Sequence, residues 1–255
     1  MLLDGRVVLV AGAGPGLGAA VARRAAAQGA SLVLAARTAP ALDEIAKTVD
    51  GPVRAVPTDL NDDGALRQLI DAALAEFGRI DVLIQNAFTM PPMGTLGRVD
   101  LDGIGQGLHD NVITALRVVR AATPALVASR GSIVVVNSAV LRHSRRPFGP
   151  YRLAKAALLA AAQNLAGELG PKGVRVNSVA PGWIWADQLR GWFEFQAARR
   201  GVPARQIYDE VAAQTDLRRL PEPDEVADAI LFLASDLARG ITGACLDVNC
   251  GEFHH

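Results

Sequence analysis

Hydrophobic residues along the chain fall into short continuous runs of valine, leucine and isoleucine, separated by longer alanine-rich segments. Continuous rather than alternating apolar runs are typical of parallel strands whose two faces are both covered by helices. The runs predict strands at 7–10, 32–34, 53–56, 82–84, 133–136, 174–179 and 245–248. The segments between them have helical character, beginning with a predicted helix at about 19–28.

Repeated alternation of strand and helix predicts an α/β fold: a doubly wound, Rossmann-type, mostly parallel sheet with helices on both faces, forming a three-layer sandwich. The chain has 255 residues, of which 50% are hydrophobic, so it can bury one large core. No internal repeat or low-complexity linker divides it. We therefore expect a single nucleotide-binding domain over residues 1–255.

Composition narrows the range of partners. Lysine plus arginine and aspartate plus glutamate number 26 each, so no net charge favours nucleic acid or an anionic membrane, and a small molecule is the expected partner. No eighteen uncharged apolar residues run together, which predicts no membrane span. Asp4 stands where a signal peptide would carry positive charge, and Cys245 and Cys250 fit neither a disulfide framework nor a metal site, so we expect a reducing, cytoplasmic location. His254 and His255 have no companions for a metal site, and no metal is expected.

A glycine-rich segment, AGAGPGLG at residues 11–18, follows the first predicted strand and opens a helix. Glycines let a pyrophosphate approach the backbone, and the helix N-terminus directs amide groups at it. The segment predicts a dinucleotide phosphate site at Gly12, Gly16, Leu17 and Gly18. A purely structural turn is the alternative for such a segment on its own.

Three features together resemble the compact, single-domain branch of the short-chain dehydrogenase/reductase family. They are the glycine spacing, the Tyr151-x-x-x-Lys155 pair, and Ser138 thirteen residues before the tyrosine. The resemblance extends from about Arg6 to Gly251. It implies an NAD(P)-dependent oxidoreductase that interconverts a ketone and a secondary alcohol by hydride transfer.

The resemblance also implies the role of each catalytic residue. Tyr151 would be the general acid or base, Lys155 would hold the cofactor ribose and tune Tyr151, Ser138 would hydrogen-bond the substrate oxygen, and Asn111 would position a proton-relay water. Lowering a tyrosine pKa from 10 to about 7 takes about 4 kcal/mol. A positive charge at about 5 Å supplies about 3 kcal/mol at an effective dielectric near 20. We therefore expect Lys155, helped by oxidised nicotinamide, to lower the pKa of Tyr151.

Further matches follow in chain order and imply other cofactor contacts. These are Asp59 and Leu60 at the adenine, Asn86 and Ala87 in a segment resembling Asn-Asn-Ala-Gly, and Pro181, Gly182 and Ile184 at the nicotinamide amide. The chain departs from the family pattern at Ala11, Gln85, Phe88 and Ala186. Phe88, where the family has glycine, puts the local turn geometry in question, and Ala186 removes one possible hydrogen bond to the cofactor.

The preference between NAD(H) and NADP(H) depends on the residues at the end of the second strand, where this chain has Ala36 followed by Arg37. An acidic residue there would repel a 2′-phosphate, whereas an arginine can pair with it. We therefore expect NADP(H) to be preferred over NAD(H). A solvated arginine is the alternative, and Pro15 occupies a glycine-loop position that is often basic in NADP-using relatives.

Substrate selection is expected in a lid at about 183–215, which holds all three tryptophans, Trp183, Trp185 and Trp192. Trp183 and Trp185 favour a bulky apolar substrate, an alicyclic or aromatic ketone or alcohol, whereas Trp192 either covers an apolar pocket or packs onto the core. Alternatively, Arg142, Arg145 and Arg146 could receive an anionic substrate bearing a carboxylate or phosphate. His143 in the same loop could act as a second proton donor.

Two rival functions stay open at this stage. A related epimerase or dehydratase would keep its nicotinamide bound, but such relatives usually have a longer C-terminal region. A catalytically silent, dinucleotide-sensing protein of the same fold is the other. The resemblance further implies a homo-oligomer, a tetramer built from the last helix and strand and the helices carrying Asn111 and Tyr151.

Overall fold

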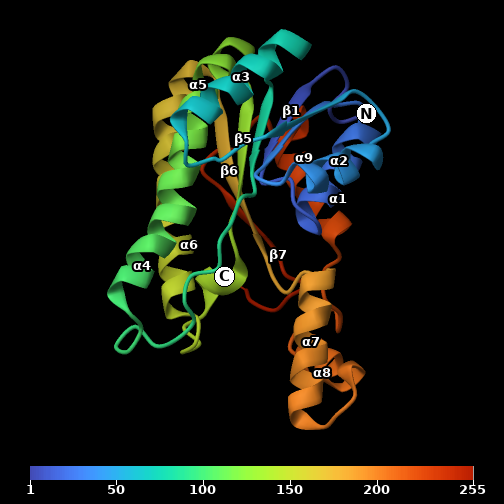
Figure 1. The fold of residues 1–255 in the computed structure, drawn as a ribbon, viewed down its shortest axis with the longest axis vertical. Helices are drawn as coiled ribbons and strands as arrows, with labels where there is room; N and C mark the ends of the chain where they lie inside the picture. The colour runs from blue at the N-terminus through green and yellow to red at the C-terminus, as the bar shows by residue number, and fades with distance from the viewer. Residues whose placement is uncertain (255) are drawn as a thin grey trace.

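The computed structural model describes residues 1–254, and in it parallel strands form a single sheet (Figure 1). The order across the seven-stranded sheet is β3-β2-β1-β4-β5-β6-β7. The strands are β1 (Val7–Ala11), β2 (Ser31–Ala36), β3 (Val53–Pro57), β4 (Val82–Gln85), β5 (Ser132–Val136), β6 (Arg175–Pro181) and β7 (Cys245–Val248). Each of the predicted strands is present, and the predicted fold class is confirmed.

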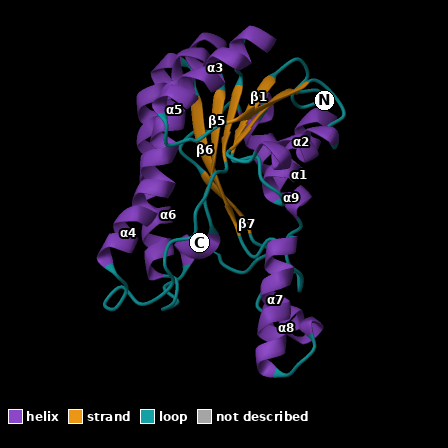
Figure 2. Cartoon of the chain, viewed as in Figure 1, coloured by secondary structure: helices purple, strands orange, loops and turns teal. Residues whose placement is uncertain are grey.

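Helices cover both faces of the sheet, as Figures 1 and 2 show. On one face lie α1 (Leu17–Ala27), α2 (Ala39–Lys47) and α9 (Pro223–Ala234); on the other lie α3 (Asp63–Phe77), α5 (Thr114–Ser129) and α6 (Gly149–Leu169). Successive strand side chains point to opposite faces, so Val8 and Val10 join the first core while Val7 and Leu9 join the second. The continuous apolar runs of the sequence follow from this double coverage.

Helix α4 (Leu101–Leu108) continues through a π-helical turn (His109–Ile113) into α5. The combined stretch Leu101–Ser129 is, by length and composition alone, apolar enough to cross a membrane. A core helix of a soluble protein meets the same criterion, and α5 packs Val118, Val119 and Leu126 into the core under the sheet. The absence of a membrane span thus stays a prediction.

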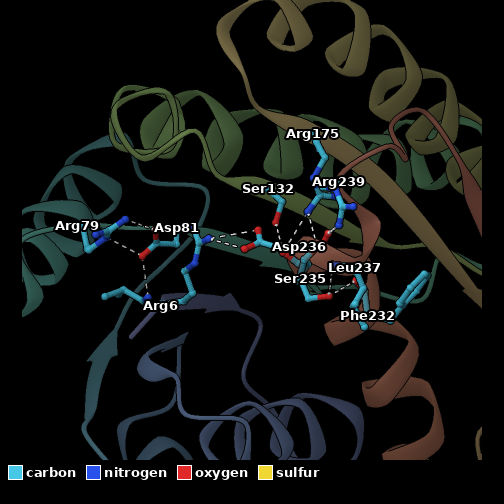
Figure 3. Close-up of polar contacts among 12 residues, drawn as sticks. Arg6, Arg79, Asp81, Ser132, Arg175, Phe232, Ser235, Asp236, Leu237 and Arg239 are labelled. Carbon is cyan, nitrogen blue, oxygen red and sulfur yellow. Dashed lines mark hydrogen bonds and ion pairs between the residues drawn. The ribbon is translucent and has the colours of Figure 1, made fainter. Parts of the chain in front are cut away.

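Charged side chains close the edge of the sheet at which the strands begin (Figure 3). Asp81, just before β4, is buried and accepts hydrogen bonds from the Val7 backbone N–H at 2.9 Å and from the guanidinium groups of Arg6 and Arg79. Arg175, at the start of β6, donates to backbone carbonyls at the end of α9, including that of Leu233 at 2.7 Å. Because the charges and helix-end carbonyls named here have partners, this edge of the sheet stabilises the fold.

Two helices project from the body beyond the carboxyl edge of the sheet (Figures 1 and 2). They are α7 (Asp187–Arg200) and α8 (Ala204–Ala212), and they pack on each other around Phe193, Ala197, Ile207 and Leu220. This pair of helices and the residues that join it to β6 make up the segment that the sequence analysis predicts to be a lid, at about 183–215.

Candidate active site

The glycine segment lies at the carboxyl end of β1, in the crevice between β1 and β4. Gly12 has φ +92°, and a Cβ there would lie 2.3 Å from the backbone nitrogen of Ala87. A Cβ on Gly18 would lie 2.7 Å from the Gly12 carbonyl oxygen. The backbone is therefore packed as closely as glycine allows, and it leads into the N-terminus of α1. This cradle fits the pyrophosphate of a dinucleotide cofactor.

The residues after β4 fix the cradle in place. The backbone N–H groups of Asn86 and Ala87 donate to the Ala11 carbonyl at 2.9 and 2.8 Å, and Asn86 Nδ2 donates to the Gly12 carbonyl at 2.7 Å. Asn86 and Ala87 thus lie at the cradle, where the sequence places them. Their hydrogen bonds are made within the protein and fix the conformation of the glycine segment.

The residues expected at the adenosine end lie beside β2 and β3. Arg37 follows β2, is exposed, and has no ion pair or hydrogen bond within residues 1–254. Asp59 is exposed and accepts a hydrogen bond from the Asn61 backbone N–H at 2.9 Å, while Leu60 is buried. Arg37 is thus free to meet a charge on the ribose.

Tyr151, Ser138 and Lys155 come together at the carboxyl end of β5 and the start of α6. Ser138 lies close enough to Tyr151 to lower the tyrosine pKa, and its hydroxyl accepts a hydrogen bond from the Val140 backbone N–H at 3.2 Å. Lys155 lies one helical turn after Tyr151, and its Nζ donates to the Val136 carbonyl at 3.0 Å. The structure thus brings the three predicted catalytic groups together.

Lys155 is buried, with 3% of its surface exposed. Burial lowers its pKa to about 7, because the charged ammonium loses the solvation of water. Its nearest aromatic neighbour is Phe88, whose ring centroid lies 4.8 Å from Nζ. A lysine that titrates near neutrality can hold or release a proton within the site.

The pKa of Tyr151 depends on its surroundings in the structure. Burial raises its pKa above the ordinary 10, and the hydrogen bond from Ser138 offsets only part of that rise. Nζ of Lys155 lies 6.0 Å from the tyrosine ring centroid. In the protein without its cofactor, burial therefore dominates the Tyr151 pKa, and the lowering expected from Lys155 and oxidised nicotinamide together stays a prediction.

Asn111 lies in the π-helical turn between α4 and α5 and is buried. Its Nδ2 donates to the carbonyls of Thr89 and Gly107, each at 2.8 Å, and its Oδ1 accepts from the Thr89 backbone N–H at 3.3 Å. The side chain therefore anchors the segment that follows β4. Both amide hydrogens of Asn111 are used within the protein, so at this side chain a relay water could bind only to Oδ1, as a donor.

The segment predicted to contact the nicotinamide amide follows β6. Gly182 donates its backbone N–H to the Val248 carbonyl at 3.0 Å, and Ile184 packs against the core beneath α1. Ala186 begins α7, and its Cβ would lie 3.6 Å from a Cβ on Gly16. Pro181, Gly182 and Ile184 thus lead the chain from the sheet to the glycine cradle.

Aromatic rings from separate segments form a continuous row beside the catalytic residues. His143 contacts Phe148 at 5.6 Å between centroids, Phe148 contacts Trp183 at 6.3 Å, and Trp183 stacks on Trp192 at 5.6 Å. Trp185 differs from the expectation, because it packs on Phe193 and Tyr208 inside the α7–α8 pair. Trp183 and Trp192 thus belong to this row of rings, whereas Trp185 does not.

The basic loop before Tyr151 is largely neutralised. Arg142 pairs with Asp247 at 3.1 Å, and Arg145 pairs with Glu252 at 3.2 Å. Glu252 is buried, which raises its pKa, and it also accepts a hydrogen bond from Trp183 Nε1 at 3.3 Å. These contacts bind the C-terminal segment to the loop.

His143 is held neutral in the same cluster. Burial and the nearby charges of Arg145 and Arg152 lower its pKa. Its Nδ1 accepts from the Arg145 backbone N–H at 3.2 Å, and its ring packs on Phe253 at 5.2 Å. This environment disfavours the protonated imidazole that a second proton donor requires.

No group of three or more potential metal ligands occurs within residues 1–254. His254 contacts Asp216 at 2.7 Å. His255, the second member of the terminal pair, lies outside the described residues.

Comparison with known proteins agrees with this arrangement. A family model described as enoyl-(acyl carrier protein) reductase matches residues 12–252, and dehydrogenase/reductase SDR family member 4 of Bos taurus is 33% identical over 99% of this chain and 89% of its own length. The chain belongs to the short-chain dehydrogenase/reductase family. It is an NAD(P)-dependent oxidoreductase, and members of this family act on small-molecule substrates.

Two further relatives are informative. The cis-4-hydroxycyclohexanecarboxylate dehydrogenase of Sinomonas cyclohexanicum is 35% identical over 96% of each chain. A 7α-hydroxysteroid dehydrogenase complexed with NADH and 7-oxo glycochenodeoxycholic acid superposes with a TM-score of 0.86, at 28% identity over 98% of this chain and 94% of that one.

Sequence reasoning missed several residues that contact the site. Phe88 was treated only as a departure from glycine, and the contacts of Phe148, Glu252 and Phe253 were not foreseen. Phe148 lies three residues before Tyr151, a spacing that puts it at the start of the catalytic helix. The C-terminal residues carry no comparable sequence signal, because their partners lie far away in the chain, 69 positions earlier for Trp183 and 107 for Arg145 in the case of Glu252.

Proposed function

We propose that the protein interconverts a bulky alicyclic or aromatic ketone and the corresponding secondary alcohol. The observation that carries this is the position of Ser138 beside Tyr151, with Lys155 one turn away, at the same sheet edge as the glycine cradle. That edge is where open α/β sheets bind their ligands.

The chain's own residues account for the proton chemistry. In ketone reduction the Tyr151 hydroxyl donates its proton to the carbonyl oxygen, and in alcohol oxidation the phenolate accepts it. Ser138 donates a hydrogen bond to the same oxygen and so orients the carbonyl. Lys155 binds the cofactor ribose and stabilises the phenolate when it forms. The nicotinamide cofactor, when bound, supplies or accepts the hydride.

The row of rings supports an apolar substrate. Trp183, Trp192 and Phe148 present aromatic surface next to the catalytic residues, and such surfaces bind ring systems by burial of apolar area. The names of the two relatives above denote a cyclohexane and a steroid substrate.

An anionic substrate is the second candidate, and the relative acting on a cyclohexanecarboxylate favours it. Two of the three loop arginines already pair with carboxylates, Arg142 with Asp247 and Arg145 with Glu252. Arg146 is exposed and has no ion pair within residues 1–254. It is the arginine left to receive a substrate carboxylate.

We also propose a preference for NADP(H) over NAD(H), carried by the exposed Arg37 after β2. An arginine pairs bidentately with a 2′-phosphate. KM for both cofactors, measured for wild type and Arg37→Gln, tests this. The variant should lose affinity for NADPH and keep that for NADH, while a clearly lower KM for NAD(H) in the wild type would reject the preference.

The reaction itself is tested with a fluorescence titration of NADPH and NADH, followed by a panel of cyclic and aromatic ketones read at the nicotinamide absorbance. Tyr151→Phe is the control. Turnover that disappears in this variant supports the proposal. Tight cofactor binding without turnover on any ketone of the panel favours the dinucleotide-sensing alternative.

Assembly and location belong to the same proposal. Leu101, Ile113 and Leu153 are exposed on α4, the π-helical turn and α6, the faces through which the family resemblance implies a homotetramer. Light scattering after gel filtration tests the oligomeric state. A cytoplasmic location stays proposed from the cysteine usage.

A further inference from the structure

Phe88 is the large side chain that stands against the catalytic pair. Its ring centroid lies 5.2 Å from that of Tyr151 and 4.8 Å from Lys155 Nζ. Its backbone has no positive φ, so the glycine of the family pattern is not demanded here by the turn. The backbone conformation at this position therefore accepts a residue with a side chain, and phenylalanine fits there without strain.

The backbone on both sides of Phe88 is fixed. Asn86 and Ala87 donate to the Ala11 carbonyl, and Thr89 is hydrogen-bonded at its N–H and its C=O by Asn111. A displacement of the whole segment would break these bonds. The phenyl side chain is 40% exposed, so it can rotate toward solvent about χ1 without disturbing them.

The ring also lies against Lys155, a charged group that the cofactor has to reach. Lys155 is 3% exposed, with the Val136 carbonyl as its hydrogen-bond acceptor and the Phe88 ring as its aromatic neighbour. An ammonium has three donors, and a phenyl face attracts it without accepting a conventional hydrogen bond. Phe88 directly follows Ala87 in the segment that also holds the glycine cradle in place, so its ring lies close in the chain to the expected cofactor site.

We propose that Phe88 is a side-chain gate: its ring covers Lys155 and rotates away before Lys155 binds the cofactor ribose. The inference rests on the proposed function, because that function assigns the ribose to Lys155. Displacing the ring costs the protein a cation–π contact of about 1 kcal/mol, which corresponds to about fivefold in an equilibrium constant. A variant without the ring should therefore bind the cofactor about fivefold more tightly.

The first experiment needs no cofactor. Wild type, Phe88→Ala and Phe88→Leu are acetylated with limiting acetic anhydride at pH 8, and the rate at each lysine is read by mass spectrometry. With a pKa of about 7, the Lys155 amine is mostly neutral at that pH, so access to it limits the rate. Lys172, which is exposed, serves as the internal standard.

We expect Lys155 to react faster in Phe88→Ala than in wild type, because the neutral amine that reacts at pH 8 is then no longer covered by the ring. Phe88→Leu, which keeps an apolar cover but loses the ring, should fall between them. Circular dichroism and a melting curve establish that each variant is folded. Equal Lys155 rates in all three proteins would overturn the gate.

The second experiment measures the dissociation constants of NADPH and NADH for the same proteins by fluorescence. The better cofactor should bind about fivefold tighter to Phe88→Ala. Faster acetylation with unchanged cofactor affinity would overturn the gate, because the ring would then cover Lys155 without obstructing the ribose. If neither cofactor binds any of the proteins, the proposed function fails, whereas the acetylation rates still show whether the ring covers the lysine.

Discussion

The burial of Lys155 makes a quantitative prediction about stability. Its pKa falls from an ordinary 10.5 to about 7 in the folded protein, through loss of solvation. At pH 7 the unfolded chain therefore binds a proton that the folded protein holds only half the time. At about 1.4 kcal/mol for each pKa unit, folding is disfavoured by about 4 kcal/mol at this pH.

Lys155→Met removes that cost and also removes a favourable contact. Without the ammonium, the buried Val136 carbonyl loses its donor, at a cost of about 2 kcal/mol. The net expectation is that the variant is about 2 kcal/mol more stable than wild type at pH 7, and catalytically inactive. A residue that is required for catalysis would thus lower the stability of the fold.

The stability advantage of Lys155→Met should depend on pH. Between pH 7 and 10.5 the unfolded state binds more protons at this site than the folded state, so the stability of the wild type rises with pH. At pH 9 the remaining cost is about 2 kcal/mol, and the advantage of the variant should fall to about zero. Below pH 7 the advantage should level off.

The assay is urea denaturation of both proteins at pH 6, 7, 8 and 9, at one fixed protein concentration because oligomers gain stability by mass action. Lys172→Met is the matched control, since Lys172 is exposed and should change stability by no more than about 0.5 kcal/mol. A Lys155→Met protein less stable than wild type at pH 7, or a gain independent of pH, would show that the desolvated Lys155 does not destabilise the fold.

Further predictions concern the cradle, the structural edge and the pocket. Gly12→Ala should abolish cofactor binding in a fluorescence titration and lower stability by about 2 kcal/mol or more, because φ is +92° and the new Cβ would lie 2.3 Å from the Ala87 nitrogen. Asp81→Ala should cost about 3 kcal/mol in urea denaturation, since it leaves buried donors unpaired; a loss below about 1 kcal/mol would contradict this. Trp183→Ala should raise KM about tenfold for a bicyclic ketone but leave KM for a small ketone unchanged, and equal effects on both would argue against a substrate-lining role.

The fold was predictable because its pattern is local. Each strand is a continuous apolar run, and parallel strands covered on both faces leave few other arrangements. The catalytic residues were predictable for a related reason. Tyr151 and Lys155 lie on one helix face, and Ser138 directly follows a strand, so the carboxyl edge of the sheet brings them together.

What the sequence did not predict are contacts between distant segments. Phe88 and Lys155 are far apart in the chain, and nothing in either segment indicates which way the ring turns. The same holds for Trp185, which lies two residues from Trp183 but packs inside the α7–α8 pair. Burial is likewise not visible in the sequence: desolvation raises the pKa of Tyr151 in the protein without its cofactor, and the spacing of Tyr151 and Lys155 gives no sign of this.

The two edges of the sheet differ in how they satisfy buried polar groups. At the amino edge Asp81 is surrounded by donors, so its charge is compensated (Figure 3). At the carboxyl edge Lys155 has no carboxylate partner within residues 1–254, and the side chains of Gln85 and Asn137 have buried atoms without hydrogen-bond partners. Buried polar groups without partners cost stability, and they persist where function requires them. The amino edge, where Asp81 has its donors, can hold the strands in register, while at the carboxyl edge the desolvated Lys155 lowers the stability of the fold.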